Sequence, residues 1–256
     1  MVKQSFDFSG AQGQRLSGVL ELPPGTPKAV AIFAHCFTCT KTSVAAVRVA
    51  RALTRSGMAV LRFDFAGLGL SQGNFADSTF SADVLDVVAA AAALSDRLSN
   101  PQLLIGHSLG GAAVLAAASR IASVQAVATI GAPFDAAHVT HLLGDSLETL
   151  ADVGEAEVDI GGRRFTLKRS FLEDLRHQDQ AARIQELRRA LLVLHATQDR
   201  TVGIANARAI FDAALHPKSF VALHEADHLL TRSMDAEYAA NVISAWASPY
   251  LRPVAQ

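Results

Sequence analysis

The sequence has few cysteines and no excess of charge of either sign. Only two of its 256 residues are cysteines, Cys36 and Cys39, and they fall within four residues of each other. Two cysteines cannot build a disulfide framework, which is typical of a protein from a reducing compartment. Lys and Arg together number 23, and Asp and Glu 24, so no net positive field attracts nucleic acid or an anionic membrane. We therefore expect neither as a partner.

Long apolar runs are also missing. The first ten residues carry Phe and Asp where a signal peptide would need a basic start and an apolar run. Later apolar stretches are all broken by Gly, His, Ser or Asp before the ~20 residues that a membrane span requires. Half of the residues are apolar and 18% are charged, so the chain can bury a sizeable core. We expect a soluble, cytoplasmic protein.

Short apolar runs alternate with segments of helical periodicity. Residues 5–22 alternate around a glycine-containing turn, which predicts an antiparallel hairpin. Unalternated runs, typical of strands buried on both faces, follow at 29–34, 59–63, 103–106, 126–130, 191–194 and 220–223. Helical periodicity covers 43–56, 81–98, 109–121, 204–215 and 236–251. Ser78 or Ser81 is the expected N-cap of the second helix, and Gly57 the expected end of the first. The alternation predicts an α/β fold with a mostly parallel, doubly wound sheet.

One segment, residues 135–189, interrupts this alternation. It is too long for a connection without structure of its own. Residues 157–167 alternate around Gly161 and Gly162, which predicts a small hairpin, and two short helical patterns follow it. We interpret the segment as a cap or lid over the carboxyl edge of the sheet, where ligands bind in such folds. Residues 1–134 and 190–256 then form the core domain.

A serine between glycines stands at a predicted strand-to-helix turn. The residues Gly106-His107-Ser108-Leu109-Gly110 match G-x-S-x-G, with an apolar run before them and a helical segment after them. The glycines leave room for the strained backbone that such a turn imposes on its serine. The helix N-terminus favours a developing oxyanion. Ser108 is therefore the candidate nucleophile.

A serine nucleophile needs a base, and the base needs an acid to orient it. In this kind of site the chain order is serine, acid, histidine. Asp199 follows the run at 191–194 and His228 follows the run at 220–223, so both are expected at the sheet edge that carries Ser108. We predict that His228 takes the Ser108 proton, while Asp199 fixes its tautomer and stabilises the imidazolium.

Other acids and histidines compete for these roles. Asp135, after the run at 126–130, is the alternative acid. Asp227 is expected to cap a turn or face solvent. His195 is expected to be buried and hydrogen-bonded, and His107 to pack against the nucleophile turn.

The oxyanion hole needs two backbone N–H groups. One is expected from Leu109, the residue after the nucleophile. The other is expected from the turn after the run at 29–34, and we assign it to the amide of Phe37. No cofactor and no metal are expected, since no second pair of metal ligands follows the two cysteines.

These residues resemble the α/β-hydrolase superfamily, over nearly the whole chain. The turn around Ser108 is similar to that of its esterase and lipase-like members, residues 35–37 to their His-Gly-x oxyanion turn, and residues 62–71 to a mainly structural Asp-x-x-Gly-x-Gly-x-Ser segment. Residues 35–41, 62–73 and 225–230 also resemble the hydrolase domain that some bacteria fuse to an OsmC-like thiol peroxidase domain. Because the chain stops at Gln256, we expect no such second domain and no peroxidase activity.

The resemblance has one departure, at Cys36, where the family's turn usually has glycine. Cys36 and Cys39 form C-x-x-C, and two interpretations remain. A disulfide here would distort the Phe37 amide and act as a redox switch beside the site. Alternatively, the cysteines are two small, semi-buried thiols. The motif outside a thioredoxin-like context does not separate these interpretations.

Three functions are considered for this pattern. The first is hydrolysis of small carboxylic esters through an acyl-enzyme. Its acyl pocket would be lined by Phe134, Leu142, Leu143, Phe165, Phe171 and Leu172, which alternatively form the cap's own core. The second uses the same triad for acyl transfer or aminopeptidase-like cleavage. The third is a non-catalytic ligand-binding protein, which predicts a damaged triad. The intact order of serine, acid and histidine favours a serine hydrolase acting on a small-molecule ester.

Overall fold

The apolar runs form the strands of one sheet. The computed structural model describes residues 1–252 and places eight strands in the order β1-β4-β6-β5-β7-β8-β11-β12. Their bounds are β1 (Val2–Ser5), β4 (Gly18–Leu22), β5 (Ala29–Ala34), β6 (Met58–Phe63), β7 (Leu103–His107), β8 (Ala126–Ile130), β11 (Ala190–Ala196) and β12 (Lys218–Leu223). Neighbouring strands from β6 to β12 pair in parallel. The predicted mostly parallel sheet is confirmed.

The N-terminal strands form the antiparallel edge of this sheet. β1 pairs antiparallel with β4, which in turn pairs antiparallel with β6. Between β1 and β4 the chain forms the small strand pair β2 (Phe8–Ser9) and β3 (Arg15–Leu16). By contrast, every residue of the central strands β5, β6, β7 and β8 is buried, which explains their unalternated apolar sequences.

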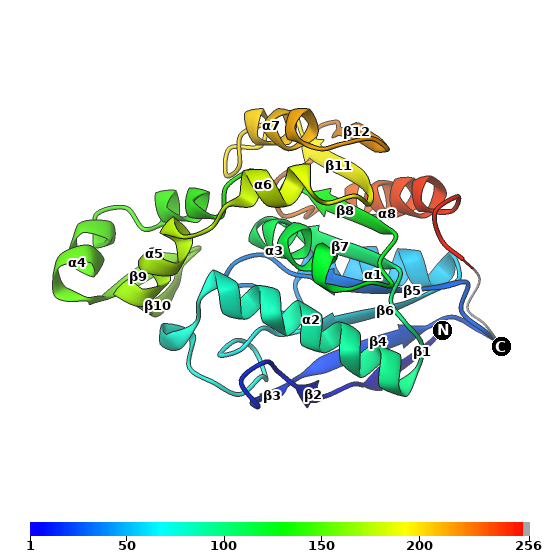
Figure 1. Ribbon diagram of the computed structural model, residues 1–256, viewed down its shortest axis with the longest axis horizontal. Coiled ribbons are helices and arrows are strands. Elements are labelled where there is room, and N and C mark those ends of the chain that lie inside the picture. Colours follow the sequence, from blue (N-terminus) through cyan, green and yellow to red (C-terminus); the bar gives the residue numbers. More distant parts are fainter. Residues whose placement is uncertain (253–256) are drawn as a thin grey trace.

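Helices cover both faces of the sheet (Figure 1). The apolar side chains of α1 (Val44–Arg55) and α8 (Ser233–Ala247) pack into one buried cluster. Those of α2 (Phe80–Arg97), α3 (Leu109–Ala117) and α7 (Ala205–Ala213) pack into a second cluster, on the other face. Two single-turn 3-10 helices, η1 (Phe75–Asp77) and η2 (Ala118–Arg120), flank these elements. No helix within residues 1–252 is long and apolar enough to cross a membrane.

The start of α2 differs from the prediction. Its N-cap is Thr79, whose Oγ1 accepts a hydrogen bond of 3.1 Å from the amide of Ala82. The predicted caps, Ser78 and Ser81, are wrong because each hydroxyl is engaged elsewhere. Ser78 Oγ donates to a carbonyl of η1 at 2.7 Å, and Ser81 Oγ donates to the carboxylate of Asp174 at 2.5 Å.

The chain between β8 and β11 forms a group of short elements. They are η3 (Ala136–Leu142), α4 (Ser146–Val153), β9 (Glu155–Ile160), β10 (Arg163–Lys168), α5 (Arg169–Arg176) and α6 (Gln180–Gln185). β9 and β10 pair antiparallel around Gly161 and Gly162. In Figure 1, α4, α5 and this hairpin extend beyond one end of the sheet. Leu150, Val158 and Leu167 are buried in the cluster that also contains the apolar residues of α2 and α3, so this segment shares its core with the layer beneath it.

Candidate active site

Ser108 sits in a strained turn between β7 and α3. Its φ is +55° and its ψ −126°, a conformation that side-chain-bearing residues rarely adopt and that is found at functional sites. The flanking glycines are required by close contacts. A Cβ on Gly106 would lie 2.3 Å from the carbonyl oxygen of Gly110, and a Cβ on Gly110 would lie 2.3 Å from that of His35. The spacing of the G-x-S-x-G motif is therefore a steric consequence of the turn.

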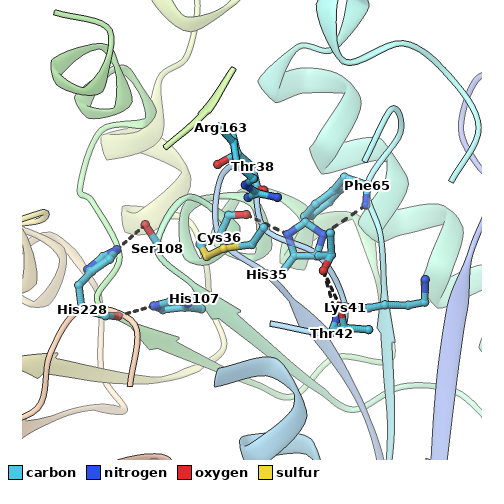
Figure 2. Close-up of a disulfide and its surroundings, with 12 residues drawn as sticks. His35, Cys36, Thr38, Lys41, Thr42, Phe65, His107, Ser108, Arg163 and His228 are labelled. Carbon is cyan, nitrogen blue, oxygen red and sulfur yellow. Dashed lines mark hydrogen bonds between the residues drawn. A yellow bond between two sulfur atoms is a disulfide. The ribbon is translucent and has the colours of Figure 1, made fainter. Parts of the chain in front are cut away.

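The three predicted triad residues lie in one hydrogen-bonded row. Nε2 of His228 lies 3.0 Å from Oγ of Ser108 (Figure 2). Nδ1 of the same ring lies 2.7 Å from Oδ2 of Asp199. Because an ionised carboxylate only accepts hydrogen bonds, Nδ1 carries the proton and Nε2 is left to accept the proton of Ser108. The three side chains come from the carboxyl ends of β7, β11 and β12, the edge that the sequence predicts.

Asp199 is held as an anion with one oxygen reserved for the histidine. Its Oδ1 accepts hydrogen bonds of 2.8 Å and 2.9 Å from the amides of Thr201 and Val202. Burial alone would raise the pKa of Asp199, but the hydrogen bonds from His228 and from these two amides lower it below its ordinary value. The side chain of Asp199 is only 1% exposed, so its negative charge acts on His228 with little solvent screening.

The competing residues occupy structural positions. Asp135 caps η3 by accepting the amide of Ala137 at 2.9 Å. Asp227 accepts the amide of Thr231 at 3.0 Å. His195 is fully buried, and its Nε2 lies 2.7 Å from the carbonyl oxygen of Val202.

His107 has a contact that sequence reasoning did not find. Its Nε2 donates a hydrogen bond of 2.7 Å to the backbone carbonyl of His228, shown as a dashed line in Figure 2. The second residue of the nucleophile turn therefore holds the backbone of the candidate base. Since 121 positions separate the two residues, no local pattern signals this contact.

The two amides assigned to the oxyanion hole lie on adjoining elements. The close approach of Gly110 to the carbonyl of His35 brings the N-terminus of α3 against the turn that follows β5. Within residues 1–252, neither the amide of Phe37 nor that of Leu109 donates a hydrogen bond to the protein. Amides inside a protein normally have a partner. Because these two have none within those residues, they are available to donate to an oxygen atom of a ligand.

Cys36 and Cys39 are joined by a disulfide in this turn. The interpretation of two free thiols is therefore wrong for this structure. The bond encloses Phe37 and Thr38, and the amide of Cys39 donates to the carbonyl of Cys36 at 3.0 Å. Thr38 has a φ of +59°, in the left-handed region. Figure 2 shows the disulfide between the Ser108–His228 pair and the ring of His35.

Buried polar side chains form hydrogen bonds and an ion pair that hold the same turn in place. Nδ1 of His35 donates to the carbonyl of Cys36 at 2.9 Å, and its Nε2 accepts the amide of Phe65 at 3.4 Å. Burial lowers the pKa of His35 to about 4, so the ring is neutral and this tautomer is retained at neutral pH. Further along the turn, Lys41 pairs with the buried carboxylate of Asp64.

Two cavities meet at Ser108. The larger, of about 320 Å³, is lined by residues that include His228, Leu142, Ile160, Arg163 and the disulfide. The smaller, of about 20 Å³, contains Leu109, Pro133, Val139 and Leu142. Of the apolar residues expected to line a pocket, Leu142 does so, whereas Leu143, Phe171 and Leu172 are buried in the core. Within residues 1–252, no three His, Cys, Asp or Glu side chains are grouped as a metal site requires.

A serine in a strand-turn-helix elbow, followed in the chain by an acid and a histidine after later strands of a mostly parallel sheet, is the arrangement of the α/β hydrolases. The comparisons with known proteins agree. A family model described as serine aminopeptidase, S33, matches residues 25–154. The chain is 49% identical to the esterase domain of a Rhodothermus marinus protein, whose crystal structure matches with a TM-score of 0.81 over 98% of this chain and 99% of that one.

Two curated relatives have named activities. Mouse palmitoyl-protein thioesterase ABHD10, mitochondrial, is 27% identical over 80% of this chain and 70% of its own length. The monoacylglycerol lipase of Mycolicibacterium smegmatis is 23% identical over 97% of this chain and 98% of its own. The chain therefore belongs to the serine aminopeptidase S33 family of α/β hydrolases. It is a serine hydrolase of the esterase and thioesterase type, which confirms the predicted fold and superfamily. The resemblance to the OsmC-fused hydrolase domain stays a prediction.

Proposed function

We propose that this protein hydrolyses small carboxylic esters through an acyl-enzyme on Ser108. The observation that carries the proposal is the 3.0 Å contact between Nε2 of His228 and Oγ of Ser108, together with the 2.7 Å contact from the same ring to Asp199. A base that is within hydrogen-bond reach of a nucleophile and is itself oriented by an acid is the signature of covalent catalysis. We assign the roles of nucleophile, base and orienting acid to these residues.

The reaction follows from this geometry in two halves. His228 takes the proton of Ser108 as Oγ attacks the ester carbonyl, and the resulting oxyanion accepts hydrogen bonds from the amides of Phe37 and Leu109. The imidazolium then gives its proton to the departing alcohol, which leaves the acyl group on Oγ. A water molecule, deprotonated by His228, attacks the acyl-enzyme, and expulsion of Ser108 with return of the proton releases the acid.

The cavities support an assignment of the two halves of the substrate. The leaving group must lie beside His228, because it receives a proton from Nε2. The larger cavity contains that ring, so we assign it to the leaving group. The smaller cavity is lined by Phe37 and Leu109, whose amides are assigned to the oxyanion hole, but not by His228, and we assign it to the acyl group. Its volume of about 20 Å³ restricts the acyl group to the shortest chains. Residues 135–189 contribute Leu142 to both cavities and Ile160 to the larger, which supports their role as a cap on the core of residues 1–134 and 190–256.

The lining favours esters over peptides with a free amino terminus. Recognition of an α-ammonium group calls for a carboxylate near the scissile bond. The residues that line the two cavities at Ser108 include no Asp or Glu, and the larger cavity includes Arg163. A cationic amino terminus would be repelled there. The relatives named esterase, thioesterase and lipase support the same acyl-enzyme chemistry.

The test is turnover of p-nitrophenyl acetate, butyrate, octanoate and palmitate by the wild type beside Ser108→Ala. We expect a burst of p-nitrophenol followed by turnover, both abolished in Ser108→Ala, with kcat/KM falling from the short to the long acyl chains. Intact-mass measurement after rapid quenching should detect the acyl adduct on the wild type alone. Absence of burst and turnover on every ester, in folded protein, would overturn the esterase proposal.

A further inference from the structure

Two adjacent arginines at the tip of the β9–β10 hairpin have different surroundings. Arg164 pairs with Glu157 on the neighbouring strand, over 3.0 Å. Arg163 is exposed, and it forms no ion pair with any carboxylate of residues 1–252. Arg163 instead lines the larger cavity, together with Ser108 and His228. An arginine without a carboxylate partner in a cavity that contains the nucleophile calls for a functional explanation.

Arg163 contacts another residue that lines the same cavity, Thr38. Its Nη2 donates a hydrogen bond to the backbone carbonyl of Thr38, within the loop closed by the disulfide, as Figure 2 shows. The guanidinium also lies 5.3 Å from the centre of the Phe165 ring. One of its five N–H donors is thus occupied. The others remain available, in a fork whose shape matches the two oxygens of a carboxylate or phosphate.

The charges around the cavity leave this cation uncompensated. The remaining lining is formed by apolar side chains, threonines, the disulfide, Gly161, Ser108 and His228, and none of these is an acid. Asp199, the anion closest to the reaction, is 1% exposed behind His228 and is paired with it. An anionic ligand group entering the larger cavity would therefore meet a positive charge and no facing carboxylate.

We propose that Arg163 binds a carboxylate or phosphate group on the leaving alcohol or thiol of the substrate. The proposal rests on the proposed function, since the leaving group is assigned to the larger cavity by the need to receive a proton from His228. It makes Arg163 a specificity-determining residue: the preferred esters and thioesters carry a negative charge on the departing half and a short, uncharged acyl group. Arg163 takes no part in the bond-making steps.

The experiment compares matched pairs of substrates on the full chain. 4-Acetoxybenzoate and 4-acetoxybenzamide share an acetyl group and differ in the charge of the leaving phenol, and 4-acetoxyphenyl phosphate supplies the phosphate arm. Mono-p-nitrophenyl adipate beside p-nitrophenyl hexanoate moves the negative charge to the acyl side. The variants are Arg163→Gln, which removes the charge, and Arg164→Gln, the matched control on the same hairpin.

We expect Arg163→Gln to lower kcat/KM for the anionic acetates by about tenfold or more, mostly through KM, as expected for the loss of a hydrogen-bonded charge pair. Activity on 4-acetoxybenzamide should change by less than about twofold, and Arg164→Gln should leave both pairs unchanged. A larger effect on the carboxylate or on the phosphate identifies which anion is preferred.

Three results would overturn the proposal. Equal losses on charged and neutral acetates would mean that Arg163 acts only through its contact with Thr38. A charge preference confined to the adipate pair would place the anion on the acyl side. If the wild type and Arg163→Gln each turn over charged and neutral acetates equally well, there is no anion site in the cavity. If none of the acetates, charged or neutral, and none of the p-nitrophenyl esters is turned over, the proposed function fails instead, and the two failures are distinguishable.

Discussion

His107 Nε2 donates a hydrogen bond of 2.7 Å to the backbone carbonyl of His228, so the elbow that carries the candidate nucleophile also holds the candidate base. Replacing the ring with an apolar side chain leaves that carbonyl without its donor. We expect His107→Leu to reduce kcat/KM about tenfold to a hundredfold, because sub-ångström placement of a catalytic group has effects of this size. His107→Gln keeps a donor at the same reach and should retain most activity. Equal activity of the leucine and glutamine variants would contradict this role.

The same histidine predicts a pH dependence of stability. Burial, with His228 nearby, lowers the pKa of His107 to about 3, against about 6.5 in the unfolded chain. Between pH 7 and pH 5 His107 takes up a proton in the unfolded chain but not in the folded protein. This lowers the free energy of unfolding by about 2 kcal/mol at pH 5. His107→Gln lacks this proton uptake. Urea unfolding at both pH values should therefore show the variant gaining about 2 kcal/mol relative to the wild type on acidification. Parallel pH dependences would argue that His107 titrates normally in the folded state.

Asp199 and Asp135 form a matched pair for testing the assignment of the acid. In Asp199→Asn the amide can donate to Nδ1 of His228, which moves the ring proton to Nε2 and blocks acceptance of the Ser108 proton. We expect kcat to fall about 10³–10⁴-fold, as for a triad held in the wrong tautomer. Asp135→Asn keeps an oxygen for its helix cap and should have nearly wild-type kcat. Steady-state kinetics on p-nitrophenyl butyrate measures both, and a comparable loss in the two variants would contradict the assignment.

Gly110 is predicted to be irreplaceable for a steric reason. A Cβ there would lie 2.3 Å from the carbonyl oxygen of His35, which would separate the N-terminus of α3 from the oxyanion turn. Gly110→Ala should lose about 1–3 kcal/mol of stability, the usual cost of overpacking, and most of its activity. Gly203→Ala is the control, because a Cβ at that position has no heavy atom within 4 Å. Thermal unfolding and ester turnover should separate the two variants clearly.

The disulfide is expected to support activity. It ties Cys36 to Cys39 around Phe37, whose amide is assigned to the oxyanion hole, and both sulfur-bearing residues line the larger cavity. A cross-link this short stabilises a fold by about 2 kcal/mol in the chain-entropy treatment. Reduction removes it and should lower kcat by loosening the turn. The double variant Cys36→Ser, Cys39→Ser should have the kcat of the reduced enzyme, and adding reductant should not change it. Higher kcat after reduction would instead support distortion of the Phe37 amide by the disulfide.

Much of the fold was predictable because each signal is local. Central strands buried on both faces are apolar at nearly every position, as in β5, and this makes them visible without any alignment. The elbow around Ser108 is also visible in the sequence, because G-x-S-x-G is a short motif, although one of its glycines is required by a contact with His35, far earlier in the chain. The start of α2 was not predictable, because Asp174, 93 positions away, engages one of the candidate capping hydroxyls.

The sequence by itself determined the order of strands and helices and the candidates Ser108, Asp199 and His228, because hydrophobic periodicity and the chain order of a triad are one-dimensional properties. Only the tertiary structure decided which acid faces the histidine, that His107 holds the backbone of His228, and that Arg163 reaches the turn around Thr38. Each of these contacts joins residues between 29 and 125 positions apart. Partners so distant become neighbours only when parallel strands bring their carboxyl ends to one edge, and a hairpin from a later segment folds back over it.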